Sequence, residues 1–376
     1  MTDPTKIPRS GEDDYSADIV EQRQRFIEAQ TGTTLEHTKQ FSFDPHEMDG
    51  NIENFWGVAQ IPIGVAGPLL VNGEHAQGEF YVPMATVEGT MLASYNRGMK
   101  VIKEAGGVLT TVSQESMQRS PVFMFNDSRQ GRDVQIRLKD NLENIKARAE
   151  TSTSVGKLHE IESYHAHSMI FTRFDYSTGD AAGQNMVSRA TFIACEWINQ
   201  QRPEMLHYML SGNFDTEKKT SSVNLLKTRG RRVTAEITVP RDILMKHLRV
   251  APEQIAYGQQ ISTLSAILTN SSNNANHPAN ALAALYLATG QDVANIGESN
   301  QCTTFQRATS KGDFYFSITL PALIMATFGG GTNLATQREC LELMDCFGKD
   351  RAYKLLEIAA GMVVAGELSL SAATKR

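Results

Sequence analysis

The segment 277–297 constrains the fold of this chain more than any other. It reads HPANALAALYLATGQDVANIG, and apolar side chains surround nearly the whole of the predicted helix. A helix that is apolar on all faces belongs in the middle of a large core. With 376 residues the chain is too long for one compact core, so we expect two or three packed units.

The composition is that of an ordinary folded protein and argues against several classes of function. The chain is 41% hydrophobic and 21% charged, and its net charge of -6 leaves no basic surplus for nucleic acid. No run approaches about 18 uninterrupted apolar residues, and the polar N-terminus lacks the apolar core of a signal peptide. The four cysteines lack metal-site spacing. We expect a cytoplasmic protein with reduced thiols, no metal and no membrane contact.

Helical and strand patterns alternate along the chain and predict an α+β fold. Residues 1–46 should form a loose arm followed by a helix over 17–30, and residues 88–107 should form a second helix. Strands are expected at 121–126, 133–138 and 169–176, and again at 231–240 and 314–327. We therefore predict a small α+β unit at 121–210, set within a large unit made of 47–120 and 211–376.

Glu88 and the pair Lys218 and Lys219 are candidates for chemistry, although each has a simpler interpretation. Glu88 lies in the first turn of a predicted helix, where a carboxylate is usually just a favourable partner of the helix dipole. Its apolar neighbours suggest a poorly solvated site, which raises a carboxyl pKa as a general acid requires. Adjacent lysines are most often solvated charges on a loop, but in an interdomain cleft an ammonium would stabilise an oxyanion.

Asp292 is more informative because it follows the apolar helix. If it is buried it needs a cationic partner, and a lysine is the natural candidate. The alternative is that Gly290 ends the buried part and Asp292 faces water. His277 is a predicted N-cap with Asn280 one turn on, and both residues could instead face the same pocket.

Two glycine-containing turns are candidates for contact with a cofactor. They are TGDAAGQN at 178–185 and GGGT at 329–332. Glycine allows backbone N–H groups to approach a pyrophosphate, and a helix N-terminus favours the anion. Neither turn is the GxGxxG of a dinucleotide-binding fold, so each is weak evidence alone.

Taken together, seven ordered blocks resemble the HMG-CoA (3-hydroxy-3-methylglutaryl-CoA) reductase family, closer to class I than to class II. The blocks are GNIENFWGVAQIPIGVAGPL, MATVEGTMLASYNRG, TGDAAGQNM, SGNFDTEKK, HPANALAALYLATGQD, FGGGTNL and AGELSL. The resemblance implies reduction of HMG-CoA to mevalonate and CoA through mevaldehyde, with NADPH as the expected cofactor and NADH as the alternative. It also implies a large helical substrate-binding domain with a long central helix and an inserted ferredoxin-like, cofactor-binding small domain.

The resemblance assigns roles to individual residues. The catalytic set falls on Glu88, Lys218 and Asp292. Substrate contacts fall on Glu53, Ser94, Asn96, Arg97, Arg119, Ser211, Lys219, His277 and Asn280. Cofactor contacts fall on Asp180, Ala182, Gly183, Asn185, Gly329, Gly330, Gly331 and Thr332. Active sites lie between subunits in the family, which implies a homodimer or a dimer of dimers.

Two positions depart from the family pattern. The family carries a histidine beyond AGELSL that protonates the departing thiolate, whereas the last histidine here is His277. Because general acid catalysis contributes ~10²–10⁴-fold, we expect slow rather than absent turnover. Ser154 stands where many NADPH-dependent members have arginine, and Lys157 could substitute for it. The alternatives are a non-catalytic binder of HMG-CoA or CoA, and a reductase of mevaldehyde or a related acyl-CoA.

Overall fold

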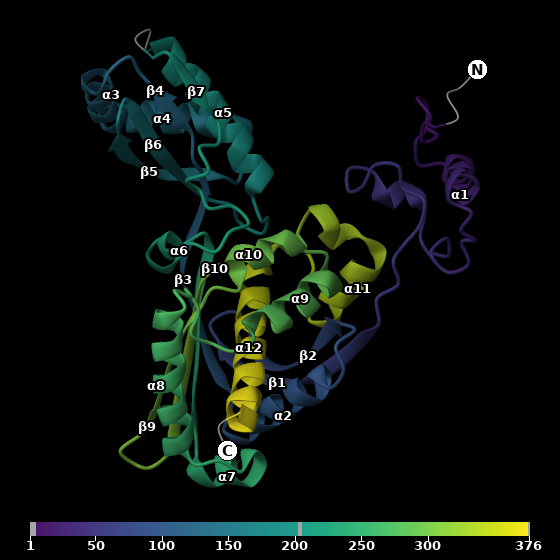
Figure 1. Ribbon diagram of the computed structural model, residues 1–376, viewed down its shortest axis with the longest axis vertical. Coiled ribbons are helices and arrows are strands. Elements are labelled where there is room, and N and C mark those ends of the chain that lie inside the picture. Colours follow the sequence, from purple (N-terminus) through teal and green to yellow (C-terminus); the bar gives the residue numbers. More distant parts are fainter. Residues whose placement is uncertain (1–4, 202–204, 375–376) are drawn as a thin grey trace.

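The computed structural model describes residues 5–201 and 205–374, so residues 1–4 of the expected arm lie outside the described residues. The fold is α+β and is built on one continuous sheet that runs through two units (Figure 1). The strand order is β7-β4-β6-β3-β8-β10-β9, with β1 and β2 joined at β3 and β5 joined at β6. All pairs are antiparallel except β1 with β3.

The large unit packs helices against strands of the first part of this sheet. Its strands are β1 (Ile63–Gly73), β2 (Gln77–Ala85), β3 (Val108–Arg119), β8 (Gly230–Val239), β9 (Thr303–Ala308) and β10 (Phe314–Leu323). Its helices are α2 (Met91–Glu104), α6 (Ser222–Leu226), α7 (Arg241–Leu248), α8 (Pro252–Leu268), α9 (Pro278–Thr289), α10 (Ile296–Ser299), α11 (Ala335–Leu343) and α12 (Ala352–Thr374). The strands expected at 231–240 and 314–327 and the helix expected at 88–107 are thus confirmed, with slightly different ends.

Two helices fill the core of the large unit. Helix α9 is buried along most of its length, as its composition predicts, but it ends at Thr289 because Gly290 takes a left-handed conformation with φ of 70°. The single helix expected over 277–297 is therefore wrong, and the longer central helix is α12 with 23 residues (Figure 1). Among the described residues α12 is long and apolar enough to cross a membrane, but 94% of its apolar window is buried in the protein.

The small unit has a βαββαβ order. Its elements are β4 (Val122–Met124), α3 (Ser128–Asp140), α4 (Leu142–Ala149), β5 (Lys157–Ala166), β6 (Met169–Ser177), α5 (Gln184–Gln201) and β7 (His207–Met209). The strands lie in the order β7-β4-β6-β5, so the two outer strands flank the first and third strands of the motif. Strand β3 also pairs with β6, and it thereby carries the sheet from one unit into the other.

The strand expected at 133–138 is wrong, because these residues lie in α3. Asp127 caps this helix by accepting hydrogen bonds from the backbone N–H groups of Arg129 and Gln130. Val134 and Leu138, four residues apart, are both buried on one face of the helix. The alternation of Val134, Ile136 and Leu138 mimics a strand, but Ile136 is exposed.

The N-terminal region forms a separate small core around α1 (Ala17–Thr31) and the 3₁₀ turn η1 (Pro45–Met48). Val20, Met48 and Phe55 make this core, so it extends past the expected boundary at residue 46. The described part of the arm is not loose. The buried Arg23 side chain donates to the carbonyl groups of Pro8 and Phe55 and pairs with Asp14.

Candidate active site

Lys218 and Asp292 meet in the structure although 74 positions separate them in the sequence. The Lys218 Nζ lies 2.8 Å from Asp292 Oδ2. The other carboxylate oxygen, Oδ1, accepts from the backbone N–H of Ala294 at 3.1 Å and caps the 3₁₀ turn η3 (Val293–Asn295). The ion pair raises the pKa of Lys218, chiefly through the hydrogen bond to Asp292. Asp292 therefore favours the charged form of the lysine, and its partner is a lysine, the candidate that the sequence analysis named.

The burial expected for Asp292 is not observed. The side chains of Asp292 and Lys218 are 41% and 42% exposed. The reason is Gly290, whose left-handed conformation turns the chain out of α9 two residues before Asp292. The alternative interpretation, in which Gly290 ends the buried part, is therefore correct, and Asp292 still has the predicted cationic partner.

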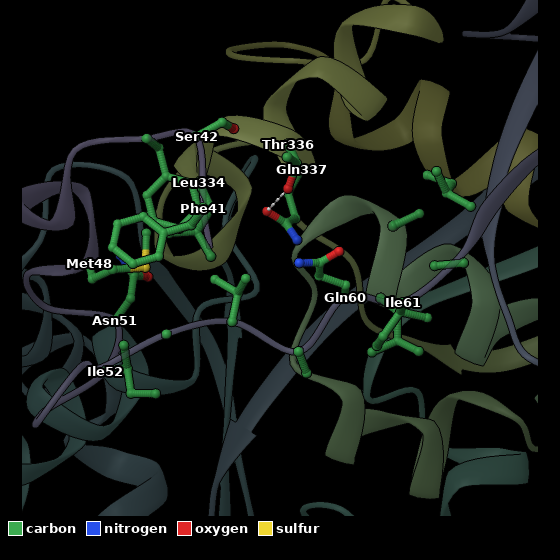
Figure 2. A pocket seen from close by; sticks show the side chains of 18 of the residues that line it. Phe41, Ser42, Met48, Asn51, Ile52, Gln60, Ile61, Leu334, Thr336 and Gln337 are labelled. Carbon is green, nitrogen blue, oxygen red and sulfur yellow. Dashed lines mark hydrogen bonds between the residues drawn. The ribbon is translucent and has the colours of Figure 1, made fainter. Parts of the chain in front are cut away.

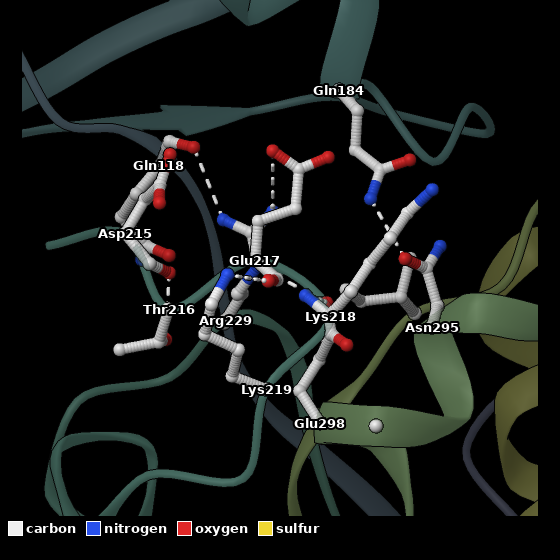
Figure 3. A network of polar contacts seen from close by, with 12 residues as sticks. Gln118, Gln184, Asp215, Thr216, Glu217, Lys218, Lys219, Arg229, Asn295 and Glu298 are labelled. Atoms are coloured by element: carbon white, nitrogen blue, oxygen red, sulfur yellow. Dashed lines mark hydrogen bonds and ion pairs between the residues drawn. The ribbon is translucent and has the colours of Figure 1, made fainter. Parts of the chain in front are cut away.

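The Lys218 loop rests on a buried polar network that the sequence did not predict (Figure 3). The backbone N–H of Lys218 donates to Glu298 Oε1 at 3.1 Å, and Arg229 Nε donates to the same oxygen at 3.3 Å. Glu298 and Arg229 are both fully buried. Burial raises the pKa of Glu298, and the Arg229 charge opposes that rise.

The backbone of Lys218 is itself strained. Its φ is 57°, a left-handed conformation that costs a residue with a side chain roughly 1–2 kcal/mol. Gly297 lies against this loop so closely that a Cβ there would stand 2.6 Å from the Lys218 carbonyl oxygen. Such strain persists only where the surrounding structure imposes it.

Both predicted glycine turns come close to the segment that carries Asp292. A Cβ on Gly290 would lie 2.1 Å from the carbonyl oxygen of Gly331, so the GGGT turn packs directly on the end of α9. On the other side, Gln184 Nε2 donates to Asn295 Oδ1 at 2.8 Å and ties the start of α5 to η3 (Figure 3). The structure thus gathers the Lys218 loop and both turns around residues 290–295.

Most of the predicted cofactor residues line these two turns. Gly183 immediately precedes the 18-residue helix α5, Asn185 is exposed in its first turn, and Ala182 is half-buried. Asp180 has a different environment, because its carboxylate accepts from the backbone N–H groups of Asp350, Arg351 and Ala352 at the start of α12. In the GGGT turn, a Cβ on Gly329 or Gly330 would meet nothing within 4 Å, while Thr332 is buried with its hydroxyl on the Gly329 carbonyl.

Glu88 lies apart from Lys218 and Asp292. Its side chain is exposed, and Asn280 Nδ2 donates to its Oε1 at 3.4 Å. Asn280 is near the N-terminal end of α9, whereas Asp292 follows its C-terminal end. At about 1.5 Å per residue the 12 residues of α9 separate the two ends by roughly 18 Å. The poorly solvated setting expected for Glu88 is absent in the single chain, and one chain does not bring all three residues together.

Four other predicted substrate residues come from the start of α9 and from α2. His277 is the N-cap as predicted, and its backbone N–H donates to the buried Glu367 of α12 at 2.6 Å. Ser94 and Arg97 both bond the hydroxyl of Ser369 on α12. Asn96 accepts from the backbone N–H of Gly67 at 2.8 Å.

The remaining predicted substrate residues lie elsewhere. Arg119 is near the Lys218 loop, where it donates to Asp215 at 3.1 Å and to Glu217 at 3.0 Å. Lys219 donates to the backbone carbonyl of Glu217. Ser211 is exposed at the start of the same loop, and Glu53 is exposed beside the N-terminal core.

An open cavity of about 770 Å³ lies between the N-terminal region and the large unit (Figure 2). Phe41, Met48 and Ile52 line one side of it, and Leu334 and Gln337 line the other. Neither Lys218 nor Asp292 contributes to its wall. This cavity is therefore separate from the ion pair.

Comparison with known proteins gives one consistent result. The sequence profile of hydroxymethylglutaryl-coenzyme A reductase matches residues 19–376. The 3-hydroxy-3-methylglutaryl-coenzyme A reductase of Pyrococcus abyssi is 42% identical, covering 93% of this chain and 88% of its own. The enzyme of the same name from Methanothermobacter thermautotrophicus is 43% identical, covering 93% and 89%.

The fold is also that of a solved reductase. The class II 3-hydroxy-3-methylglutaryl-CoA reductase of Streptococcus pneumoniae, solved with NADPH bound, aligns with a TM-score of 0.72 at 19% identity, covering 94% of this chain and 96% of its own. Archaeal relatives above 40% identity and a class II structure at 19% agree with the closer resemblance to class I. The chain belongs to the hydroxymethylglutaryl-coenzyme A reductase family.

Proposed function

We propose that this chain reduces HMG-CoA to mevalonate and CoA by two hydride transfers from a reduced nicotinamide, with mevaldehyde as the intermediate. The observation that carries this proposal is the Lys218–Asp292 ion pair, placed beside two glycine turns in a chain of this family. Each hydride adds to a carbonyl carbon and drives negative charge onto the carbonyl oxygen. An ammonium aimed at that oxygen lowers the barrier by stabilising the charge.

Lys218 and Asp292 have complementary roles in both reductions. Lys218 polarises first the thioester carbonyl and then the aldehyde carbonyl. Because Asp292 raises the lysine pKa, the ammonium keeps its proton until the oxyanion forms. The orientation of the Asp292 carboxylate is itself fixed, since its second oxygen accepts a hydrogen bond from the backbone N–H of Ala294.

Glu88 exchanges protons with the substrate oxygen in this proposal, and it does so from a second copy of the chain. In one chain most of the roughly 18 Å length of α9 lies between Asn280, the hydrogen-bond partner of Glu88, and Asp292, which argues against shared contact with one carbonyl. A homodimer, or a dimer of dimers, that apposes the two ends completes the site. Burial of Glu88 at that interface would supply the desolvation a general acid needs.

The residues of the two turns fit a dinucleotide. Gly179 and Gly183 have φ of 60° and 87°, and the following helix α5 presents its N-terminal N–H groups. Gly329 and Gly330 leave open space above the backbone. When bound there, the nicotinamide supplies the hydride. The remaining proposed contacts are Asp180, Ala182, Asn185, Gly331 and Thr332.

NADPH remains the expected cofactor, with NADH as the alternative. Val155 lies against the TGDAAG turn, since a Cβ on Gly179 would stand 2.9 Å from its side chain. The neighbouring Ser154 is exposed beside this turn and carries no charge. Lys157, the possible substitute for arginine, pairs with Glu150 at 2.8 Å.

The substrate contacts form two proposed groups. Ser94, Asn96, Arg97, His277 and Asn280 belong to the Glu88 end, while Arg119, Ser211 and Lys219 belong to the Lys218 end. Glu53 is proposed to act from its place beside the N-terminal core. A cytoplasmic location and the absence of a metal also remain proposals.

A spectrophotometric assay tests the function. The purified chain, mixed with HMG-CoA and NADPH or NADH, should oxidise the cofactor, and the product should co-migrate with mevalonate. The same assay with mevaldehyde tests whether aldehyde reduction is faster than thioester reduction. Failure to oxidise either cofactor with either substrate would refute the proposal.

A further inference from the structure

The ion pair between Lys218 and Asp292 does not by itself explain how the lysine is held in place. Both side chains are about two-fifths exposed. Ion pairs in contact with water are weak, and long side chains leave them readily. The geometry must therefore come from what holds the Lys218 backbone.

The Lys218 backbone is fixed on both sides by α10. Its N–H donates to the buried carboxylate of Glu298, and its carbonyl side lies against Gly297, where no Cβ stands in the way. Thr220, two residues on, donates to the Gly297 carbonyl at 2.9 Å. These contacts hold Lys218 in its left-handed conformation, which an unsupported lysine rarely adopts.

A single short unit carries both partners of the lysine. Asp292 caps η3, which leads directly into α10 with Glu298. The ammonium therefore binds one end of residues 292–299 and the backbone N–H of the same lysine binds the other. Arg229 lies behind Glu298, and its Nη1 also donates to the carbonyl of Gln118 on β3 (Figure 3).

We propose that Glu298, held in place by Arg229, is a positioning residue that aims the Lys218 ammonium at Asp292 and hence at the substrate carbonyl. The role of the ammonium in catalysis rests on the proposed function. The placement of the ammonium through Glu298 is independent of that function. Both hydrogen bonds fall on one oxygen, Oε1. The carbonyl oxygen of a glutamine can accept both, so the acceptor and the charge of Glu298 can be separated by substitution.

The first test compares Glu298→Ala with Glu298→Gln. Because misplacing a reacting group by about 1 Å can cost on the order of 10²-fold, Glu298→Ala should lower kcat by about that factor while KM for HMG-CoA changes little. Glu298→Gln removes the nearer of the two carboxylates beside Arg229, leaving Glu217 at 4.0 Å, and should melt at a lower temperature. It should nevertheless retain most of kcat, because the acceptor for the Lys218 N–H remains. Equal loss of kcat in both variants would overturn positioning through this hydrogen bond.

A second readout does not depend on turnover. Amine-acylating reagents attack the neutral lysine, so the labelling rate of Lys218 against pH, followed by peptide mass spectrometry, reports its pKa. Once Glu298→Ala frees the loop, the ammonium should lose Asp292 and label faster at a given alkaline pH than in the parent. Exposed Lys139 serves as the internal reference for reagent reactivity. Unchanged Lys218 labelling in a folded Glu298→Ala chain would overturn the proposal.

Two further variants complete the design. Glu253→Ala removes a carboxylate of an exposed ion pair with Arg241 and should change neither readout. If Glu298→Ala does not fold, Gly297→Ala displaces the loop by steric contact and should also speed Lys218 labelling; unchanged labelling there would count against the proposal. Absence of turnover in the parent chain would refute the proposed function alone, since the labelling comparison would still decide the positioning role.

Discussion

The proposed catalytic residues lie at opposite ends of helix α9, and their surroundings differ. At the C-terminal end, Lys218 and Asp292 are paired and rest on the buried Glu298 and Arg229. At the N-terminal end, Glu88 is exposed and has one long hydrogen bond to Asn280. The C-terminal end is thus organised within one chain. At the N-terminal end, the Glu88 carboxylate contacts Asn280 of its own chain and is otherwise open to solvent.

This difference suggests a division of labour. A group that stabilises developing charge must be in place before the reaction, because preorganised charges need no reorganisation when the oxyanion forms. A group that exchanges protons needs a desolvated setting with a tuned pKa, which a second subunit can complete. Substitutions at the Lys218–Asp292 end should therefore lower kcat more than substitutions at the Glu88 end.

Lys218→Ala tests the organised end and should have the largest effect. Removing one oxyanion donor typically costs on the order of 10²–10³-fold in kcat, and we expect the upper end because the lost donor is charged. Both the thioester and the aldehyde reductions should fail, as measured by cofactor oxidation with each substrate. Lys311→Ala is the matched control, since Lys311 is exposed in the turn between β9 and β10 and has no proposed role. Near-parent activity of Lys218→Ala on either substrate would contradict the assigned role.

Mixed dimers test whether the two ends of α9 meet across subunits. Lys218→Ala and Glu88→Gln chains, co-expressed with different affinity tags and purified through both, form dimers with one intact and one doubly altered site. Because a symmetric dimer has two equivalent sites, such mixed dimers should recover about half of parental activity per dimer. Each pure variant should stay far below that value. Mixed dimers no more active than the variants would place the whole site within one chain.

Asp292→Asn separates the charge of the pair from its hydrogen bond. Asp292 raises the pKa of Lys218, so the ammonium persists to higher pH and activity should fall only as pH rises through that raised pKa. In the variant this alkaline fall should move to lower pH. We also expect a loss of roughly 10²-fold at neutral pH, because a neutral amide attracts the ammonium less strongly and lets it shift from its position. The pH dependence of kcat measures both effects, and an unmoved alkaline limb would contradict the electrostatic role of Asp292.

The pairing of Lys218 with Asp292 was predictable from the resemblance, which placed both residues in the catalytic set. The argument from burial also named a lysine, although Asp292 is 41% exposed. The exposure of Asp292 was one of two interpretations that the sequence left open, and the left-handed turn at Gly290 decides between them. Glu298 was missed because its contacts reach back 80 positions to Lys218 and 69 positions to Arg229. One signal was available in the sequence: Glu298 stands between Gly297 and Ser299, shortly after an apolar helix.

The fold was predictable where side-chain periodicity and burial agree, as in α9 and β8. The prediction failed at 133–138. There a short alternation of apolar and polar residues resembled a strand, but the segment lies in a helix that Asp127 caps. The separation of Glu88 from Asp292 follows from the length of α9 and from the contact of Glu88 with Asn280 near its start, and the sequence predicted neither. The sequence also placed both residues in one site by resemblance, and only the three-dimensional arrangement shows that one chain leaves that site divided.

Ser154→Arg should give the smallest effect of these substitutions. It tests whether the TGDAAG turn, near the Lys218–Asp292 pair, binds the 2′-phosphate of the cofactor. Ser154 is exposed next to the TGDAAG turn, so an arginine there gains a charged hydrogen bond to a 2′-phosphate without disturbing Lys218. Because the contact is open to solvent, we expect only about a two- to fivefold rise in kcat/KM for NADPH relative to NADH. Thr151→Arg, another exposed position in the preceding turn, is the matched control. An unchanged ratio in Ser154→Arg would mean that the 2′-phosphate binds away from this turn.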